Sequence, residues 1–487
     1  MSAATATREK TGRTASSIES RLPSVLTSEP AILLAMLASL GVYYLIPGLF
    51  SAAIGGLAFF ALTVYRPALG LAMIPLVAPL FYRQRTINIR DSTLFFSLAE
   101  FVIVCNMGAW VLRDGWTFVR TRTLPWRITI PRAAGIWLAV AFAAIGLLWI
   151  FVPDIPTSDL RKVALREFRL TVLEPLLFFA LMLRWLRTER DIWRMIGAWL
   201  IAAALVGREG VEQYLFGQAA LMEGVGRATS VYPSATALGI YLGRALPLAL
   251  VLAVFLPKDR QMWRVASALL AVPIGFGVIV SFARGAWIGV FIALAVVAVI
   301  ARHKWMLAAL GAAVVAGLAA LPFIRVERIT SVFNFSTEDN TGVARAKIWT
   351  AALKIIGDHP LKGIGQDQFL YQDPSYGVPQ MRFFTTSHPH NWVLDFWLRL
   401  GLPGLVWVLA ALGYFFWQGI RLWQRLQGTA LGALTLALIA SMIDFVVHGL
   451  LDMAYFTMDL ALTFWLTMGL MVIMAWTTAD GRRPTAD

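Results

Sequence analysis

Long apolar stretches recur along almost the whole chain, and they constrain its fold more than any other feature. A membrane-spanning helix needs about 20 mostly apolar residues, because lipid cannot hydrogen-bond to free backbone groups. Of the 487 residues, 59% are hydrophobic and only 14% are charged, whereas a soluble chain carries about 25% charged residues. We therefore expect an all-α, polytopic membrane bundle with about 12–14 spans.

The expected spans fall into two groups that flank one long polar segment. They lie near residues 30–47, 50–65, 67–82, 93–112, 133–152, 170–186, 193–216, 234–256, 264–281, 284–301, 304–323, 390–417, 429–449 and 455–477. This pattern predicts a disordered cytoplasmic tail at 1–28, N-terminal transmembrane helices within 29–323 and an extracytoplasmic loop at 324–389. C-terminal transmembrane helices are expected within 390–478, followed by a second tail at 479–487.

The basic residues between the spans predict the orientation of the chain. Lys and Arg concentrate on the cytoplasmic side of membrane proteins. The segment from Arg113 to Arg132 is strongly basic, and the alternate short connections on the same predicted side are basic too. We therefore expect a multi-pass protein of the cytoplasmic (inner) membrane with both termini in the cytoplasm. The net charge of +14 then orients the chain in the membrane, and we expect no binding of nucleic acid.

The loop at 324–389 holds most of the concentrated polar sequence. Long loops usually carry function in proteins whose other connections are short. Its spacing predicts an amphipathic helix that caps a cavity or lies on the membrane surface. The apolar face is expected to comprise Ala346, Trp349, Leu353 and Ile356. The residues turned away from it are expected to be Arg345, Lys347 and Lys354.

Polar and charged residues gather at the outer ends of the predicted spans. The strongest candidates for function are Arg227, Arg284 and His390, and the supporting candidates are His388, Asn391, Arg345, His448 and Asp452. An arginine at the edge of a span is costly and seldom lacks a function. Snorkelling to headgroup phosphates is the alternative explanation for both strong arginine candidates.

This set of residues suits chemistry on a phosphate-activated substrate. Arginine binds phosphate oxygens with a bidentate fork. We expect His390 in the first turn of a helix, where the helix dipole keeps the imidazole neutral and able to act as a general base. His388 is the alternative base. Arg284 and Arg227 would bind a leaving diphosphate in place of a metal, and we expect no metal and no cofactor.

Several motifs follow one another in order in the C-terminal half. They read Ser281-Phe-Ala-Arg284-Gly285, Arg345-Ala-Lys-Ile-Trp349, Ile356-Gly-Asp-His-Pro360-Leu-Lys-Gly363-Ile-Gly365, His388-Pro-His390-Asn391 and Gly401-Leu-Pro-Gly404. From about Arg227 to its end, the chain resembles the O-antigen ligase and O-antigen polymerase superfamily of bacterial envelopes.

The resemblance implies an inverting, metal-independent glycosyltransferase. Its donor would be a glycan on undecaprenyl diphosphate at the outer leaflet, among membrane lipids, and its acceptor a glycan, a lipid or a protein. It implies that His390 is catalytic and that Arg284 and Arg227 bind the donor. An O-antigen ligase-like activity is expected first, and a polysaccharide polymerase or a protein O-oligosaccharyltransferase of the same superfamily is the alternative.

Functions of other classes are also open from the residues alone. A transporter of a lipid-linked or anionic solute would place its polar residues at the midplane of repeated, broken helices, whereas the candidates here lie at the outer edge. A scaffolding protein, whose loop docks a partner, would tolerate substitution of the histidines and arginines.

Overall fold

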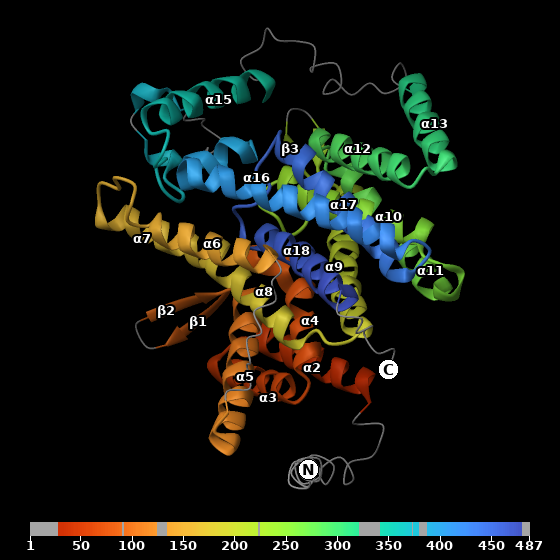
Figure 1. Cartoon of the computed structure of the whole chain (residues 1–487). Coiled ribbons are helices and arrows are strands. Elements are labelled where there is room, and N and C mark those ends of the chain that lie inside the picture. The colour runs from red at the N-terminus through yellow and green to blue at the C-terminus, as the bar shows by residue number, and fades with distance from the viewer. Residues whose placement is uncertain are drawn as a thin grey trace. The chain divides into compact units, whose positions relative to one another are not determined.

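The computed structural model describes residues 28–89, 92–123, 134–222, 225–320, 341–372, 374–378 and 387–479. Its described residues form helices almost throughout, which confirms the all-α, membrane-type fold (Figure 1). Five of these helices are long and apolar enough to cross a membrane, and several shorter apolar helices accompany them. The total of about 12–14 spans stays a prediction, and the expected tails lie almost entirely outside the described residues.

The chain folds into two compact units, Met1–Ile74 with Gln84–Pro125, and Pro75–Arg83 with Trp126–Asp487. The elements of the first unit are α2 (Glu29–Leu45), α3 (Leu49–Tyr65), most of α4 (Pro67–Val77), β1 (Arg85–Ile89), β2 (Ser92–Phe96) and α5 (Leu98–Thr121). The span expected at 93–112 is therefore wrong at its start. Its first residues pair as a strand with β1, and the helix begins only after Ser97, which forms a capping box with Glu100.

The second unit contains every candidate site residue. Its elements are η1 (Ala78–Tyr82), α6 (Ala134–Leu148), α7 (Ser158–Phe168), η2 (Arg169–Leu173), α8 (Glu174–Trp185), α9 (Glu189–Leu215), β3 (Ala220–Met222), β4 (Val225–Arg227), α10 (Ala235–Phe255), η3 (Lys258–Arg260), α11 (Gln261–Val280), α12 (Arg284–Ile300), α13 (Lys304–Ala320), α15 (Thr341–Asp358), η6 (Phe369–Tyr371), η7 (Pro374–Tyr376), α16 (Trp392–Leu426), α17 (Ala430–Gly449) and α18 (Met458–Ala479). The predicted spans of this unit each contain a helix, and α17 and α18 are almost entirely buried.

Four connecting segments meet at one end of α10–α12 and α16–α18. The amide of Ala228, just after β4, donates to the carbonyl of Val280 at the end of α11. The side-chain amide of Asn391, just before α16, donates to the carbonyl of Leu450 at the end of α17. Segments far apart in sequence therefore lie side by side here, and this end of the helices carries the candidate residues.

The predicted amphipathic helix exists as α15, but its buried face differs from the expected one. The buried side chains are Ile348, Ala351, Ala352, Ile355 and Ile356. The three isoleucines and Ala352 pack with Ile364, Phe369 and Leu398. Ala346 is exposed and Leu353 is 56% exposed. Arg345 is not turned away, because it forms an ion pair with Asp452. The helix thus packs against α16 through a face rotated from the predicted one.

Two glycines allow the segment after α15 to cross α16 at backbone contact. Gly363 and Gly401 both have positive φ angles, of 61° and 63°, a region that favours glycine. The amide of Ile364 donates to the carbonyl of Leu398 over 2.7 Å, and the amide of Leu402 donates to the carbonyl of Leu361 over 3.2 Å. Gly401 also interrupts the helical backbone of α16. The crossing therefore fixes α15 relative to the start of α16.

Substitution of Gly401 by alanine should destabilise the fold. A Cβ atom there would lie 2.1 Å from the carbonyl oxygen of Leu361, and the backbone conformation adds strain of about 1–3 kcal/mol. Thermal unfolding of purified protein in detergent should therefore show a clearly lower midpoint. The matched control is Gly413→Ala in the same helix, where a Cβ would meet nothing within 4 Å. Equal melting of the two variants would contradict the proposed role of the crossing.

Candidate functional site

The segment 387–391 presents two histidines immediately before α16. Asn391 is the N-cap of this helix, and its side-chain oxygen accepts hydrogen bonds from the amides of Val393 and Leu394. His390 therefore precedes the helix. The sequence-based expectation that it lies in the first helical turn is wrong. Its φ of 51° is uncommon for a residue with a side chain. The indole of Trp349 in α15 donates to the carbonyl of Pro389 over 2.9 Å and helps to hold this segment.

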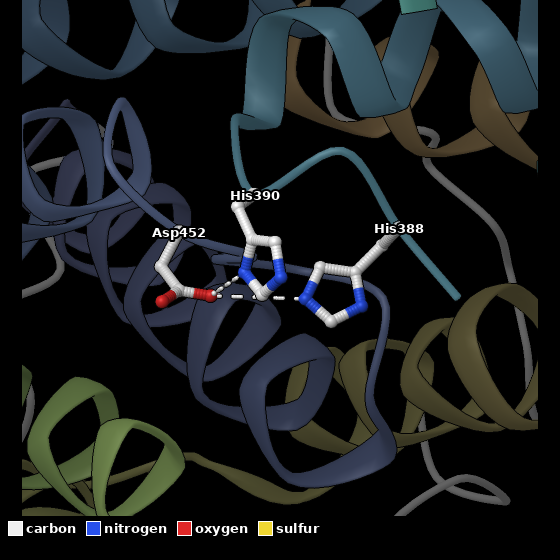
Figure 2. A group of neighbouring side chains, drawn as sticks. All are labelled: His388, His390 and Asp452. Atoms are coloured by element: carbon white, nitrogen blue, oxygen red, sulfur yellow. Dashed lines mark hydrogen bonds and ion pairs between the residues drawn. The ribbon is translucent and has the colours of Figure 1, made fainter. Parts of the chain in front are cut away.

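His390 and Asp452 form the central contact of the candidate site. His390 Nδ1 lies 2.9 Å from Asp452 Oδ1, and both histidines point toward this one carboxylate oxygen (Figure 2). Because a carboxylate only accepts hydrogen bonds, the proton of this contact belongs on Nδ1 of the neutral ring. The other ring nitrogen, Nε2, then carries the lone pair. This is the arrangement in which a histidine can act as a base.

Asp452 is buried in the connection between α17 and α18 and is surrounded by donors. Its Oδ2 lies 3.3 Å from the guanidinium of Arg345, and its Oδ1 also accepts from the amide of Met453 over 2.8 Å. Burial alone would raise the pKa of Asp452, but His390, His388 and Arg345 together hold this pKa well below its usual value. The side chain is therefore an ionised carboxylate at neutral pH.

His388 lies next to this pair. Its Nε2 is 3.7 Å from Asp452 Oδ1, its Nδ1 is 3.1 Å from the hydroxyl of Ser387, and its ring centroid is 4.3 Å from that of His390. Burial lowers the pKa of His388 and the neighbouring His390 lowers it further, although Asp452 acts in the opposite direction. His388 is thus a neutral neighbour at neutral pH.

His388, His390 and Asp452 are also the one group of described residues whose donor atoms could together hold a metal ion. Two imidazoles and a carboxylate suit zinc or another transition ion. The carboxylate is already matched by the charge of Arg345 and by the hydrogen bond of His390. The described contacts therefore hold the group together through protein donors.

Arg227 lies at the turn that precedes Arg284. It is buried at the end of β4, and its Nε donates to the carbonyl of Ser281 over 2.9 Å. The hydroxyl of Ser281 in turn accepts from the amide of Ala283 over 3.2 Å, and Phe282 has a φ of 49°. These contacts explain how a turn this tight between α11 and α12 is held.

Arg284 is the first residue of α12 and is partly exposed. Ala283, the N-cap, supplies no side-chain hydrogen bond to the helix. The first amides of a helix attract anions, and the helix dipole adds to this effect. A guanidinium and a helix amino terminus therefore lie together at this turn. Arg227 stabilises the turn through its hydrogen bond to the carbonyl of Ser281.

His448 connects this turn to the group around Asp452. It is buried near the end of α17, in the same connection region as Asp452. A Cβ at Gly285 would lie 2.5 Å from His448 Cδ2, so the imidazole packs directly on the residue after Arg284. The structure thus groups His388, His390, Arg345 and Asp452 by direct contact, with Asn391 beside them, and places Arg227 and Arg284 at a neighbouring turn that His448 touches.

A second charged network, which was not predicted from the sequence, lies near His388. Arg399 is buried in α16 and contacts carboxylates from three segments, Asp395 at 2.7 Å, Glu167 of α7 at 3.1 Å and Asp367 of the long loop at 3.6 Å. The i,i+4 spacing of Asp395 and Arg399 inside an apolar segment is the signal that could have found this network.

Comparison with known protein families finds one similarity for the part of the chain that contains this site. Residues 266–409 match the model of the O-antigen ligase family. The match includes Arg284, Arg345 and His390, and it ends before His448 and Asp452. No curated protein matches the chain. The resemblance read from the ordered motifs is confirmed, because this part of the chain is similar to the O-antigen ligase family.

Proposed function

We propose that the protein transfers a glycan from undecaprenyl diphosphate to an acceptor hydroxyl at the outer face of the cytoplasmic membrane. The observation that carries this proposal is the hydrogen bond between His390 and the buried Asp452, in a chain of which residues 266–409 are similar to the O-antigen ligase family. The family supports a glycosyltransferase-like activity. The donor, the residue roles and the side of the membrane are parts of the proposal.

In the proposed reaction His390 is the general base. As the acceptor oxygen bonds to the anomeric carbon of the donor, Nε2 of His390 takes the hydroxyl proton. The bond between that carbon and the diphosphate oxygen breaks on the opposite side, so the configuration inverts and the bonding electrons leave with the diphosphate. Asp452 stabilises the imidazolium that forms, as the carboxylate of a catalytic triad does.

The leaving diphosphate would be bound at the start of α12. Arg284 and the first amides of α12 provide donors, and Arg227 holds the turn and adds positive charge. Groups placed where charge develops stabilise the transition state without reorganisation. This arrangement supplies the charge that a divalent ion would otherwise provide. Ligation of glycan to a lipid acceptor is the favoured reaction, and polymerisation or protein glycosylation would use the same donor chemistry.

Removal of the base should abolish transfer without unfolding the protein. The His390→Ala and Asp452→Asn variants are each expected to lower kcat on the order of 10²–10⁴-fold, because the first lacks the base and the second lacks the carboxylate that orients it. Product formation from a lipid-diphosphate glycan, followed by mass spectrometry, measures the effect. The control is His359→Ala, a histidine just after α15. Full activity of His390→Ala would remove the proposed mechanism.

Substitution of Arg284 should impair use of the donor. Arg284→Ala is expected to lower kcat/KM for the lipid-diphosphate donor on the order of 10²–10³-fold, as loss of one oxyanion donor does. Arg284→Lys keeps the charge but loses the bidentate fork, so its defect should be intermediate. Arg421→Lys, at an exposed arginine stacked on Trp417, is the matched control. Unchanged donor kinetics in Arg284→Ala would separate this arginine from the reaction.

Transfer should continue in excess chelator. If the arginines replace a metal, then EDTA treatment followed by gel filtration leaves kcat unchanged. The measurement is the transfer rate before and after treatment, with metal content checked by mass spectrometry. Loss of activity that a divalent ion restores would contradict this expectation, and His388, His390 and Asp452 would then be the ligands to test first.

A further inference from the structure

Arg244 is a buried arginine in the interior of a membrane-spanning helix. It lies in the middle of α10, which is long and apolar enough to span the membrane, and it is only 2% exposed. A guanidinium in such a place is costly and normally marks a function. It is not one of the residues that the proposed reaction uses.

The contacts of Arg244 converge on the connection that carries Asp452. Its Nη2 donates to the carbonyl of Ala454. Its Nη1 donates to the carbonyl of Leu460 and to the hydroxyl of Thr463, and both of these distances are 3.0 Å. The guanidinium also lies over the ring of Phe445, 4.8 Å from its centroid. One planar fork therefore ties α10 to the connection and to the first turns of α18.

The segment 450–457 has few regular hydrogen bonds of its own. Asn391 holds its first residue through the carbonyl of Leu450. The hydroxyl of Tyr455 donates to the carbonyl of Thr171 over 2.9 Å. Ala454 lies between these anchors and only two residues after Asp452 in the sequence, so Arg244 fixes the part of the segment nearest to the carboxylate.

Asp444 and Asp459 are buried carboxyl groups that interact electrostatically with Arg244, and Asp444 is the one that the glycines of two neighbouring helices enclose. It is fully buried in α17, and neither carboxylate oxygen has a hydrogen-bond partner among the described residues. Glycines provide the space for it, because a Cβ would lie 2.3 Å from Asp444 Oδ1 at Gly289 and 3.1 Å from Oδ2 at Gly243. Two explanations of Arg244 can therefore be separated, neutralisation of Asp444 and anchoring of the segment.

We propose that Arg244 is a positioning residue for the base, which holds the segment 450–457 so that Asp452 stays in hydrogen-bonding reach of His390. This inference rests on the proposed function, because the consequence concerns the base of that reaction. The anchor acts from inside the membrane through main-chain carbonyls. Neutralisation of Asp444 accompanies this role and does not account for it.

The test compares Arg244→Met, Asp444→Asn and the double variant with the wild-type protein. The double variant removes the guanidinium and the carboxyl group of Asp444 together, while Asp459, the other buried carboxyl group that acts on Arg244, is present in both proteins. Its thermal unfolding in detergent is measured first, and the kinetics are compared only for folded protein. The double variant still lacks the bond to Ala454, and we expect kcat to fall on the order of 10²-fold with KM for the donor unchanged. Wild-type activity in the double variant would show that Arg244 only neutralises Asp444, and would overturn the proposal.

The pH profile of kcat distinguishes the positioning role from a purely structural one, because a loss of stability alone would not shift the profile. The groups that face His390 are Asp452 and His388, with Arg345 on the far oxygen of Asp452. If Asp452 shifts away, the protonated form of His390 loses its carboxylate, so the acid limb should move to lower pH. Arg244→Lys keeps the charge but not the fork, and it should show the same direction of change with a smaller loss of rate. An unshifted limb in both Arg244→Lys and the double variant would contradict the proposal.

The outcome for His390 separates this inference from the proposed function. If His390→Ala is inactive and the double variant equals wild type, the anchoring role fails and the proposed function stands. If His390→Ala is fully active, the proposed base is wrong and the anchoring of Asp452 loses its purpose as well.

Discussion

The buried carboxylate of Asp452 is the interaction on which the candidate site depends. A charge removed from water must be matched by donors or by opposite charge. Here the donors come from α15 through Arg345, from the segment before α16 through His390, and from the amide of Met453. One carboxylate therefore draws together the long loop, the start of α16 and the connection between α17 and α18. The same contact that closes this part of the structure also orients the ring that would act as a base.

Much of the helical framework was predictable, because the membrane imposes strict rules on a chain of this composition. Lipid leaves no alternative to helix for a long apolar segment, and each predicted span does contain helix. The ends of those segments also predicted which residues lie at the same end of the helices. Arg227, Arg284 and the histidines could therefore be expected near one another. The strand at 92–96 escaped prediction because a short β-branched and aromatic run reads equally well as the start of a span.

The details of the site depended on contacts that spacing cannot reveal. The buried face of α15 is set by Leu398 and Ile364, which pack against it from outside the helix. Since α15 carries apolar residues on more than one side, its sequence alone could not choose between Leu353 and Ile355. Likewise, the positive φ of His390 and the pairing of Arg345 with Asp452 follow from tertiary packing. The residue types were predictable here, and their partners were not.

The ordered motifs combine two kinds of residue with different physical roles. Arg284 and His390 are the residues proposed to bind the donor and to take a proton, whereas Gly363 and Gly401 permit a backbone crossing that any side chain would block. The family match runs through both kinds but stops before Asp452, and it begins after Arg227 and Arg244. The matched domain thus packs the long loop against α16 and contains His390, the proposed base, while the carboxylate of Asp452 comes from the next connection. Arg244 in α10 donates to the carbonyl of Ala454, two residues after Asp452, so the buried guanidinium and the polar group around His390 meet in one connecting segment.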